Sequence, residues 1–178
     1  EKLAALHNLA ERMGERLTFS GDCIEVLGSG NQSKGSYTSL GDAISHAESG
    51  DTLKVLEDIT DASAVTITDK DLTLNLQDKT ISFNGGPGYV AIVVTGTASL
   101  MVEGTGTLSL NKVSSNILII NKGSGKVTIR GGTFSGSGSN GSVLTNYSIG
   151  SIDIEGGIIS STGYERPAIV NGGTGKVS

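Results

Sequence analysis

The chain of 178 residues carries 13 Lys or Arg and 18 Asp or Glu, which gives a formal net charge of −5 at pH 7. This acidic balance argues against a nucleic-acid partner, because no basic stripe is present to neutralise phosphates. No run of about 18 apolar residues occurs, so we expect no membrane span in this fragment. The 27 Gly, the 3 Phe and the absence of Trp are typical of short strands joined by tight turns.

The first 35 residues are predicted to form a separate segment. Apolar residues recur every three or four positions along residues 1–17, which predicts an amphipathic helix. This helix either packs on its own domain or mediates self-association through residues 1–17. A short strand pair over residues 18–28 and a Gly/Ser/Asn-rich linker over residues 28–36 are expected to follow it. The second domain would then cover residues 36–178.

A second helix is predicted over residues 39–49. Ser39 is its expected N-cap, and Gly50 follows its last turn. Its apolar face consists of Leu40, Ala43, Ile44 and Ala47. Because a strand-forming segment follows at once, we expect this helix to cap the end of a solenoid, whose first coil would otherwise expose unpaired strand edges.

Pairs of apolar residues then recur along the chain, separated by 19, 28, 27, 25 and 25 residues. The first residues of these pairs are Leu53, Leu72, Leu100, Val127, Ile152 and Val177. Two further apolar centres follow each pair, so one coil of about 25 residues would contain three short strands. A sandwich or an up-and-down barrel gives no reason for such a register, whereas stacking of equivalent strands requires it. The predicted fold is therefore an all-β parallel β-helix.

Polar and turn residues support the same register. Asn121, Asn146 and Asn171 recur at intervals of 25 residues, and their stacked side chains are expected to form a structural ladder of hydrogen bonds along the axis. The segments GSGKV, SIGSI and GTGKV precede successive coils, and Gly-Gly at 131–132 and 156–157 marks another corner. These residues predict scaffold rather than a ligand site.

The segment over residues 37–83 contains YTSLGDAISHAESGDTLKVLEDIT and LTLNLQDKTIS. It resembles the opening of the right-handed, pectin-lyase-like β-helix domains of bacterial cell-surface proteins, and by pattern the resemblance continues to residue 178. It implies a right-handed solenoid in an extracellular protein, on the cell surface or secreted, and it does not imply catalysis. Since the chain begins without Met and ends inside a coil, we expect a C-terminally truncated fragment of a longer protein.

Candidate catalytic residues lie in one outward column, on the first strand of successive coils. The column reads Asn75, Glu103, Arg130 and Glu155. Neighbouring coils lie about 4.8 Å apart, which would place Arg130 between two acids. The column is either a ladder of ion pairs or a catalytic site, with Arg130 as the base of a polysaccharide lyase or Glu103 and Glu155 as the carboxyl pair of a glycoside hydrolase. The clustered aspartates and G-H-G motif that would resemble polygalacturonases are absent, which favours the ladder.

No cofactor is expected, with Ca²⁺ as the one ion considered. Asp153 and Glu155 are its candidate ligands, because they point the same way from one strand. Their separation of about 7 Å is wide for one ion without further ligands. The sequence therefore predicts no metal centre.

The aromatic residues expected to be exposed on coil loops are Tyr89, Tyr147 and Tyr164, and the loops expected to contact a partner are 84–90, 136–142 and 161–167. Loops carry most binding functions, so these tyrosines are the candidate contacts to a glycan or to a host or cell-wall protein. The expected function is a non-catalytic extracellular module, a rigid spacer or adhesin-like domain. The alternatives are a carbohydrate-binding or polysaccharide-degrading β-helix, and a self-assembling structural protein.

Overall fold

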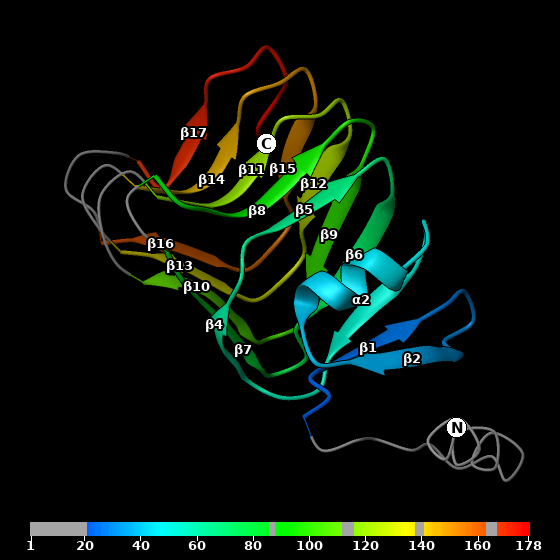
Figure 1. The fold of residues 1–178 in the computed structure, drawn as a ribbon. Coiled ribbons are helices and arrows are strands. Elements are labelled where there is room, and N and C mark those ends of the chain that lie inside the picture. Colours follow the sequence, from blue (N-terminus) through cyan, green and yellow to red (C-terminus); the bar gives the residue numbers. More distant parts are fainter. Residues whose placement is uncertain (1–20, 86–87, 112–115, 138–140, 163–166) are drawn as a thin grey trace, which may run out of the picture.

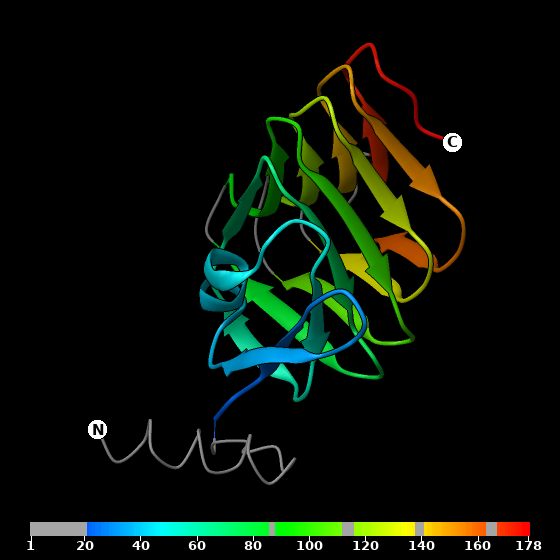
Figure 2. The same cartoon turned by 90° about the vertical axis from the view of Figure 1, so that its right-hand side faces the viewer.

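Short strands of three to six residues make up most of the computed structural model, which describes residues 21–85, 88–111, 116–137, 141–162 and 167–178. Strands β3 to β17 contribute in turn to three sheets, so the chain is an all-β parallel solenoid of about four turns (Figure 1). Figure 2 shows the coils following one another from the N-terminal hairpin to the C-terminus. None of the described helical structure has the length and apolar character that a membrane crossing requires.

Each sheet collects every third strand. The first sheet consists of β2 (Ser33–Tyr37), β1 (Ile24–Leu27), β3 (Thr52–Val55), β6 (Asp71–Asn75), β9 (Ser99–Glu103), β12 (Lys126–Ile129) and β15 (Ser151–Ile154). The second consists of β4 (Ile59–Ala62), β7 (Thr80–Asn84), β10 (Thr107–Asn111), β13 (Thr133–Gly136) and β16 (Ile158–Ser161). The third consists of β5 (Val65–Thr68), β8 (Val90–Thr95), β11 (Ile117–Asn121), β14 (Ser142–Asn146) and β17 (Ile169–Asn171).

Strand pairing within the coils is parallel and aligns equivalent residues. Val127 pairs with Leu100 on one side and with Ile152 on the other, as the repeat predicts. The first predicted interval is wrong, because Leu53 pairs with Leu74 rather than Leu72. Both leucines face the core from β6, and a shift of two residues keeps every side chain on its own face of the strand. The apolar pattern alone therefore fits either register.

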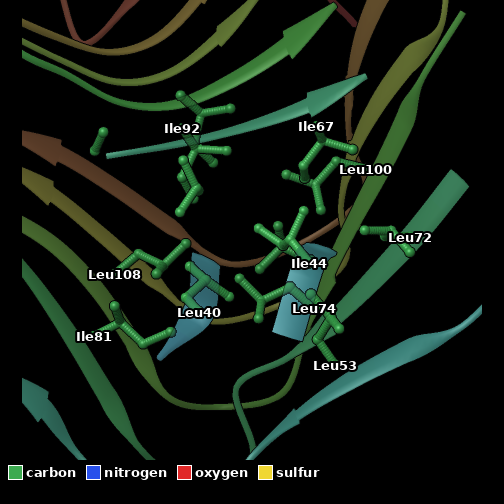
Figure 3. Packing of buried hydrophobic residues seen from close by; sticks show 14 of the residues in the cluster. Leu40, Ile44, Leu53, Ile67, Leu72, Leu74, Ile81, Ile92, Leu100 and Leu108 are labelled. Atoms are coloured by element: carbon green, nitrogen blue, oxygen red, sulfur yellow. The ribbon is translucent and has the colours of Figure 1, made fainter. Parts of the chain in front are cut away.

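The core is one continuous cluster that runs through all the coils. Alternate residues of the strands point inward, and the largest of them, Phe83 and Phe134, are 0% exposed. Figure 3 shows side chains from the three sheets converging with Leu40 and Ile44 of the helix. Burying one such aliphatic side chain contributes about 1.5–3 kcal/mol, so the apolar alternation is the main source of stability.

The N-terminal hairpin belongs to the first sheet. Strand β1 pairs antiparallel with both β2 and β3, and Ile24 and Val26 are 0% exposed against the core. The linker expected over residues 28–36 therefore contains β2, and the boundary expected between residues 35 and 36 falls inside that strand. The Gly and Ser residues of this segment favour a linker. The buried residues that pack the hairpin against the core lie in β1 instead. The helix predicted over residues 1–17, with its self-association, lies outside the described residues.

Helix α2 (Leu40–His46) is shorter than the helix expected over residues 39–49. The side chain of Ser39 accepts a hydrogen bond from the backbone N–H of Asp42 (3.1 Å), as expected of an N-cap. At the other end, the Lys70 ammonium donates to the carbonyl oxygens of Ile44 (3.0 Å) and Ala47 (2.8 Å). A cation at this position also interacts favourably with the helix dipole.

Gly41 offers a test of how α2 is packed. A Cβ added there would meet no atom closer than 3.9 Å, namely Ser39 Oγ and Val65 Cγ1. Since Ala restricts the unfolded chain more than Gly does, Gly41→Ala is expected to raise the free energy of unfolding by about 0.5–1 kcal/mol in urea denaturation. A loss of stability would contradict the described packing of the helix.

Candidate functional site

A single row of polar side chains crosses the outer face of the first sheet. Backbone pairing aligns its members from β1 to the residues that follow β12 and β15, in the order Glu25, Lys54, Asn75, Glu103, Arg130 and Glu155. The repeat pattern predicts the last four members of the row but not Glu25 and Lys54. The available signal was one charged residue between two apolar ones, in Ile24-Glu25-Val26 and Leu53-Lys54-Val55.

Arg130 contacts one acid of this row rather than two. Its Nε donates to Oε2 of Glu155 at 2.9 Å, while its Nη1 lies 3.2 Å from the sulfur of Met101. The backbone register places Arg130 between Glu103 and Glu155, as expected, but among the described side chains its guanidinium pairs with Glu155 alone. Both members of the ion pair are 50% exposed, and such pairs contribute little to stability.

Glu103 is held by amides instead. Its Oε1 accepts a hydrogen bond from Nδ2 of Asn75 at 2.7 Å. The Asn75 oxygen in turn accepts from the backbone N–H of Gln77 (2.9 Å) and from its side-chain amide (2.6 Å). Arg130 and Glu155 thus pair with each other, and the described side chains show no contact that joins Glu103 to either of them.

Asp153, the other candidate metal ligand, also forms an ion pair with a basic side chain. Its carboxylate lies 2.5 Å from the Lys126 ammonium and accepts a hydrogen bond from the Ser178 hydroxyl at 2.9 Å. The hydrogen bond from Lys126, followed by that from Ser178, lowers the pKa of Asp153, and the same contact raises the pKa of Lys126. Within the described ranges, no three His, Cys, Asp or Glu residues come together as metal ligands. Asp153 and Glu155 each face a cation rather than one another.

The Lys126–Asp153 pair can be tested by titration. Because the pKa of Asp153 is lowered by folding, the pair adds stability above the unfolded-state pKa, and this contribution is lost as the pH falls through the folded-state pKa. Lys126→Met is expected to raise the pKa of Asp153, measured by NMR of its carboxyl carbon. Lys122→Met, which removes an exposed lysine outside the Lys126–Asp153 pair, is the matched control. An unchanged Asp153 pKa in Lys126→Met would contradict the pairing.

A groove of about 560 Å³ lies over the N-terminal part of the row. Its lining residues come from the β1–β2 hairpin, from β3, and from the ends of β6 and β9 with Gln77 beyond β6. Its lining combines carboxylates, amides, hydroxyls and one ammonium, from Glu25, Leu27, Asn31, Ser33, Thr52, Lys54, Asn75, Gln77 and Glu103. Such a lining provides hydrogen-bond donors and acceptors for a polar ligand, but it contains no aromatic side chain.

The candidate binding tyrosines are placed differently from one another. Tyr89 is half-buried: its ring covers Gly85, its hydroxyl donates to the carbonyl oxygen of Ala62 (3.3 Å), and burial raises its pKa. The expectation that Tyr89 is exposed is therefore wrong. Tyr147 is 47% exposed, with its ring against Gly172 of the next coil. Tyr164 lies outside the described residues.

The first two members of the asparagine column lie inside the solenoid, and the third, Asn171, is exposed. Asn121 pairs with Asn146 and Asn146 with Asn171 in the third sheet, and the first two are 0% exposed. The amide of Asn146 donates to the Asn171 oxygen at 3.1 Å and to the carbonyl oxygen of Gly150 at 3.0 Å. These amides therefore tie each strand end to the corner that follows it.

The fold and this face define a parallel β-solenoid with a polar, partly ion-paired outer sheet. Comparison of the chain with models of protein families, with curated proteins and with solved structures gives no match. The function is therefore argued from the residues and the geometry above.

Proposed function

We propose that the chain is a right-handed, pectin-lyase-like β-helix module, which acts without catalysis on or outside a bacterial cell as a rigid spacer. The observation that carries the proposal is the stacking of parallel strands in three sheets along one continuous core. Backbone hydrogen bonds in three sheets join neighbouring coils. A stack of this kind is stiff, because bending it would distort the hydrogen bonds of all three sheets. Parallel crossovers are overwhelmingly right-handed, which supports the proposed hand.

Two further features support the proposal. Val127 pairs with Ile152 and Ile152 with Val177, each after 25 residues, which agrees with the proposed coil length. Helix α2 buries Leu40, Ala43 and Ile44 against the first coil, as a capping helix would. The extracellular, bacterial setting rests on the resemblance of residues 37–83 alone. The module would present its variable loops to a glycan or protein partner.

The spacer role is tested by measuring stiffness. A donor and an acceptor fluorophore are attached to the two ends of the module, with a Gly/Ser linker of the same number of residues as the control. We expect a narrow distribution of distances across the solenoid and a broad one across the linker, because a Gly/Ser chain behaves as a flexible random coil. Equally broad distributions would contradict the proposal. A panel of uronate and neutral polysaccharides, assayed with Ca²⁺ and with chelator, should yield no cleavage products.

A second candidate function is carbohydrate binding, which the groove beside Lys54 and Glu103 favours. Its amides and carboxylates match the mixed donors and acceptors of sugar hydroxyls. A glycan array is expected to show binding that Glu103→Gln weakens and that Tyr147→Ala, remote from the groove lining, leaves unchanged. Loss of binding in Tyr147→Ala alone would move the site to the loops.

A further inference from the structure

The ion pairs of the described residues differ in how deeply they are buried. In the Lys126–Asp153 pair the side chains are 50% and 25% exposed. In the Lys34–Asp51 pair they are 30% and 3% exposed, and the Lys34 ammonium donates to both oxygens of Asp51 at 2.9 Å. The second pair therefore contains a carboxylate that is almost entirely removed from solvent.

The Lys34–Asp51 contact joins two segments that share no backbone pairing. Lys34 belongs to β2, and Asp51 lies directly before β3. Strand β1 lies between these two strands in the first sheet. Because Nζ of Lys34 lies at the same distance from both carboxylate oxygens, it faces Cγ, the carbon that carries them. An amine is thus held against the carbon of a buried carboxyl group.

Glu48 contributes two further groups to this cluster. Its Oε2 lies 2.6 Å from the Lys34 ammonium and can accept a proton from it. Its backbone N–H donates to Oδ2 of Asp51 at 2.8 Å. A donor at this place stabilises negative charge that develops on Oδ2 when a nucleophile attacks Cγ. One residue therefore supplies both a base for the amine and a donor for the carboxyl group.

We propose that Lys34 and Asp51 become joined by an isopeptide bond. A proton passes from the Lys34 ammonium to the Glu48 carboxylate, and the neutral Nζ attacks Cγ of Asp51. A second proton of Nζ and the proton held by Glu48 pass to the departing Oδ1. The bond between Cγ and Oδ1 breaks, and water leaves as the amide forms. One ammonium and one carboxylate are consumed, and no oxidant, reductant or other co-reactant is required.

The ion pair is the starting state of this reaction. Hydrogen bonds to Glu48 and then to Asp51 raise the pKa of Lys34, so the amine forms only through the proton transfer within the cluster. Two effects favour the product. An uncharged amide replaces a carboxylate at a buried position, where charge is costly. The fold also holds the two reacting groups in contact, which raises their effective concentration far above that of free groups.

The bond would fasten the N-terminal hairpin to the first coil. Residues 34–51, which include α2, would form a covalently closed loop. Such a closure restricts the unfolded chain in the same way as a disulfide. The strand β2 would then stay attached to the solenoid even when its backbone hydrogen bonds to β1 open. This inference does not depend on the proposed spacer function, although a spacer under tension would gain from it.

Mass spectrometry tests the proposal. The intact full chain, measured after denaturation, is expected to be lighter than its sequence by one water molecule. Tandem spectra of a protease digest should contain a branched peptide that joins Lys34 to Asp51, and none that joins Lys126 to Asp153. An intact mass equal to that of the sequence would overturn the proposal, as would a loss of water located at other residues.

Three variants test the roles of the residues. Lys34→Arg keeps the positive charge but replaces the amine with a guanidinium, which stays protonated, so the full mass should return. Glu48→Gln removes the base, and intact masses followed after cell-free synthesis should show bond formation slowed by about a hundredfold. Lys126→Arg is the matched control at the more exposed pair and should still lack one water. A cross-linked mass in Lys34→Arg, or an unchanged rate in Glu48→Gln, would contradict the proposed reaction.

Discussion

Replacing Gly150 with alanine is expected to lower the free energy of unfolding by about 3 kcal/mol, the upper part of the usual range for overpacking. A Cβ at this position would point into the backbone of the preceding coil, against the carbonyl oxygen of Gly125 and 2.6 Å from that of Gly123. Backbone atoms cannot move aside as a flexible side chain does, because they are fixed in the strand pairing of β12 and β15. The substitution must therefore push two coils apart.

The same close approach recurs at the equivalent corners of the neighbouring coils, before β12 and after β17. A Cβ on Gly125 would collide with the carbonyl oxygen of Ala98, and one on Gly175 with that of Gly150. These glycines form a column in which successive coils touch backbone to backbone. The effect of one substitution is therefore expected to pass to the neighbouring coils, since each coil is stabilised by its contacts with the next.

Urea denaturation of Gly150→Ala beside Gly41→Ala measures this effect. Both variants add one methyl group, but only position 150 lies against backbone atoms, whereas position 41 has its nearest neighbours at 3.9 Å. The two substitutions should change stability in opposite directions. A Gly150→Ala protein within about 0.5 kcal/mol of the wild type, the usual range of surface substitutions, would contradict the backbone contact between coils.

The features that could be predicted from the sequence are those that recur from one coil to the next. The corner glycines and the asparagine column recur because a coil can rest on the next only if equivalent positions carry compatible residues. The first coil departs from this rule. Its neighbour on one side is the hairpin strand β1 rather than another coil. The number of residues between its apolar positions and those of the next coil therefore cannot be checked against an earlier repeat. Leu72 and Leu74 then fit the apolar pattern equally well, so the pattern does not show that Leu53 pairs with Leu74.

The candidate site shows the same limit at the level of side chains. Backbone register placed Arg130 beside both Glu103 and Glu155, but register does not determine which acid a long side chain reaches. Asn75 occupies one oxygen of Glu103, and Met101 lies next to the guanidinium, so Arg130 pairs with Glu155. Its place on a loop predicts an exposed Tyr89, but the partner of its hydroxyl, the carbonyl oxygen of Ala62, lies 27 residues away in the chain. Such contacts depend on the fold and leave no periodic signal.

The asparagine column provides the second large effect. Asn146→Asp is expected to destabilise the protein by about 3–5 kcal/mol at neutral pH, the cost of a buried charge without a partner. Asn146 is 0% exposed, and its amide faces the oxygens of Gly150 (3.0 Å) and Asn171 (3.1 Å). A carboxylate would replace the amide N–H donor with an oxygen, which would face the oxygens of Gly150 and Asn171 without a hydrogen bond. Within the described structure the Asn146 oxygen has no hydrogen-bond partner, so the donor contacts carry the contribution of this side chain.

The pH dependence separates charge from lost hydrogen bonds. Asn146→Ala removes the donor without adding charge and should cost about 1–3 kcal/mol at every pH. In Asn146→Asp, burial among acceptors raises the folded-state pKa of the new carboxyl above its unfolded value of about 3.9. The native state then binds more protons than the unfolded state between the two pKa values, so the deficit relative to the wild type should shrink as the pH falls through this window. Equal, pH-independent deficits in the two variants would mean that water reaches the column and that the amides are not enclosed between the coils.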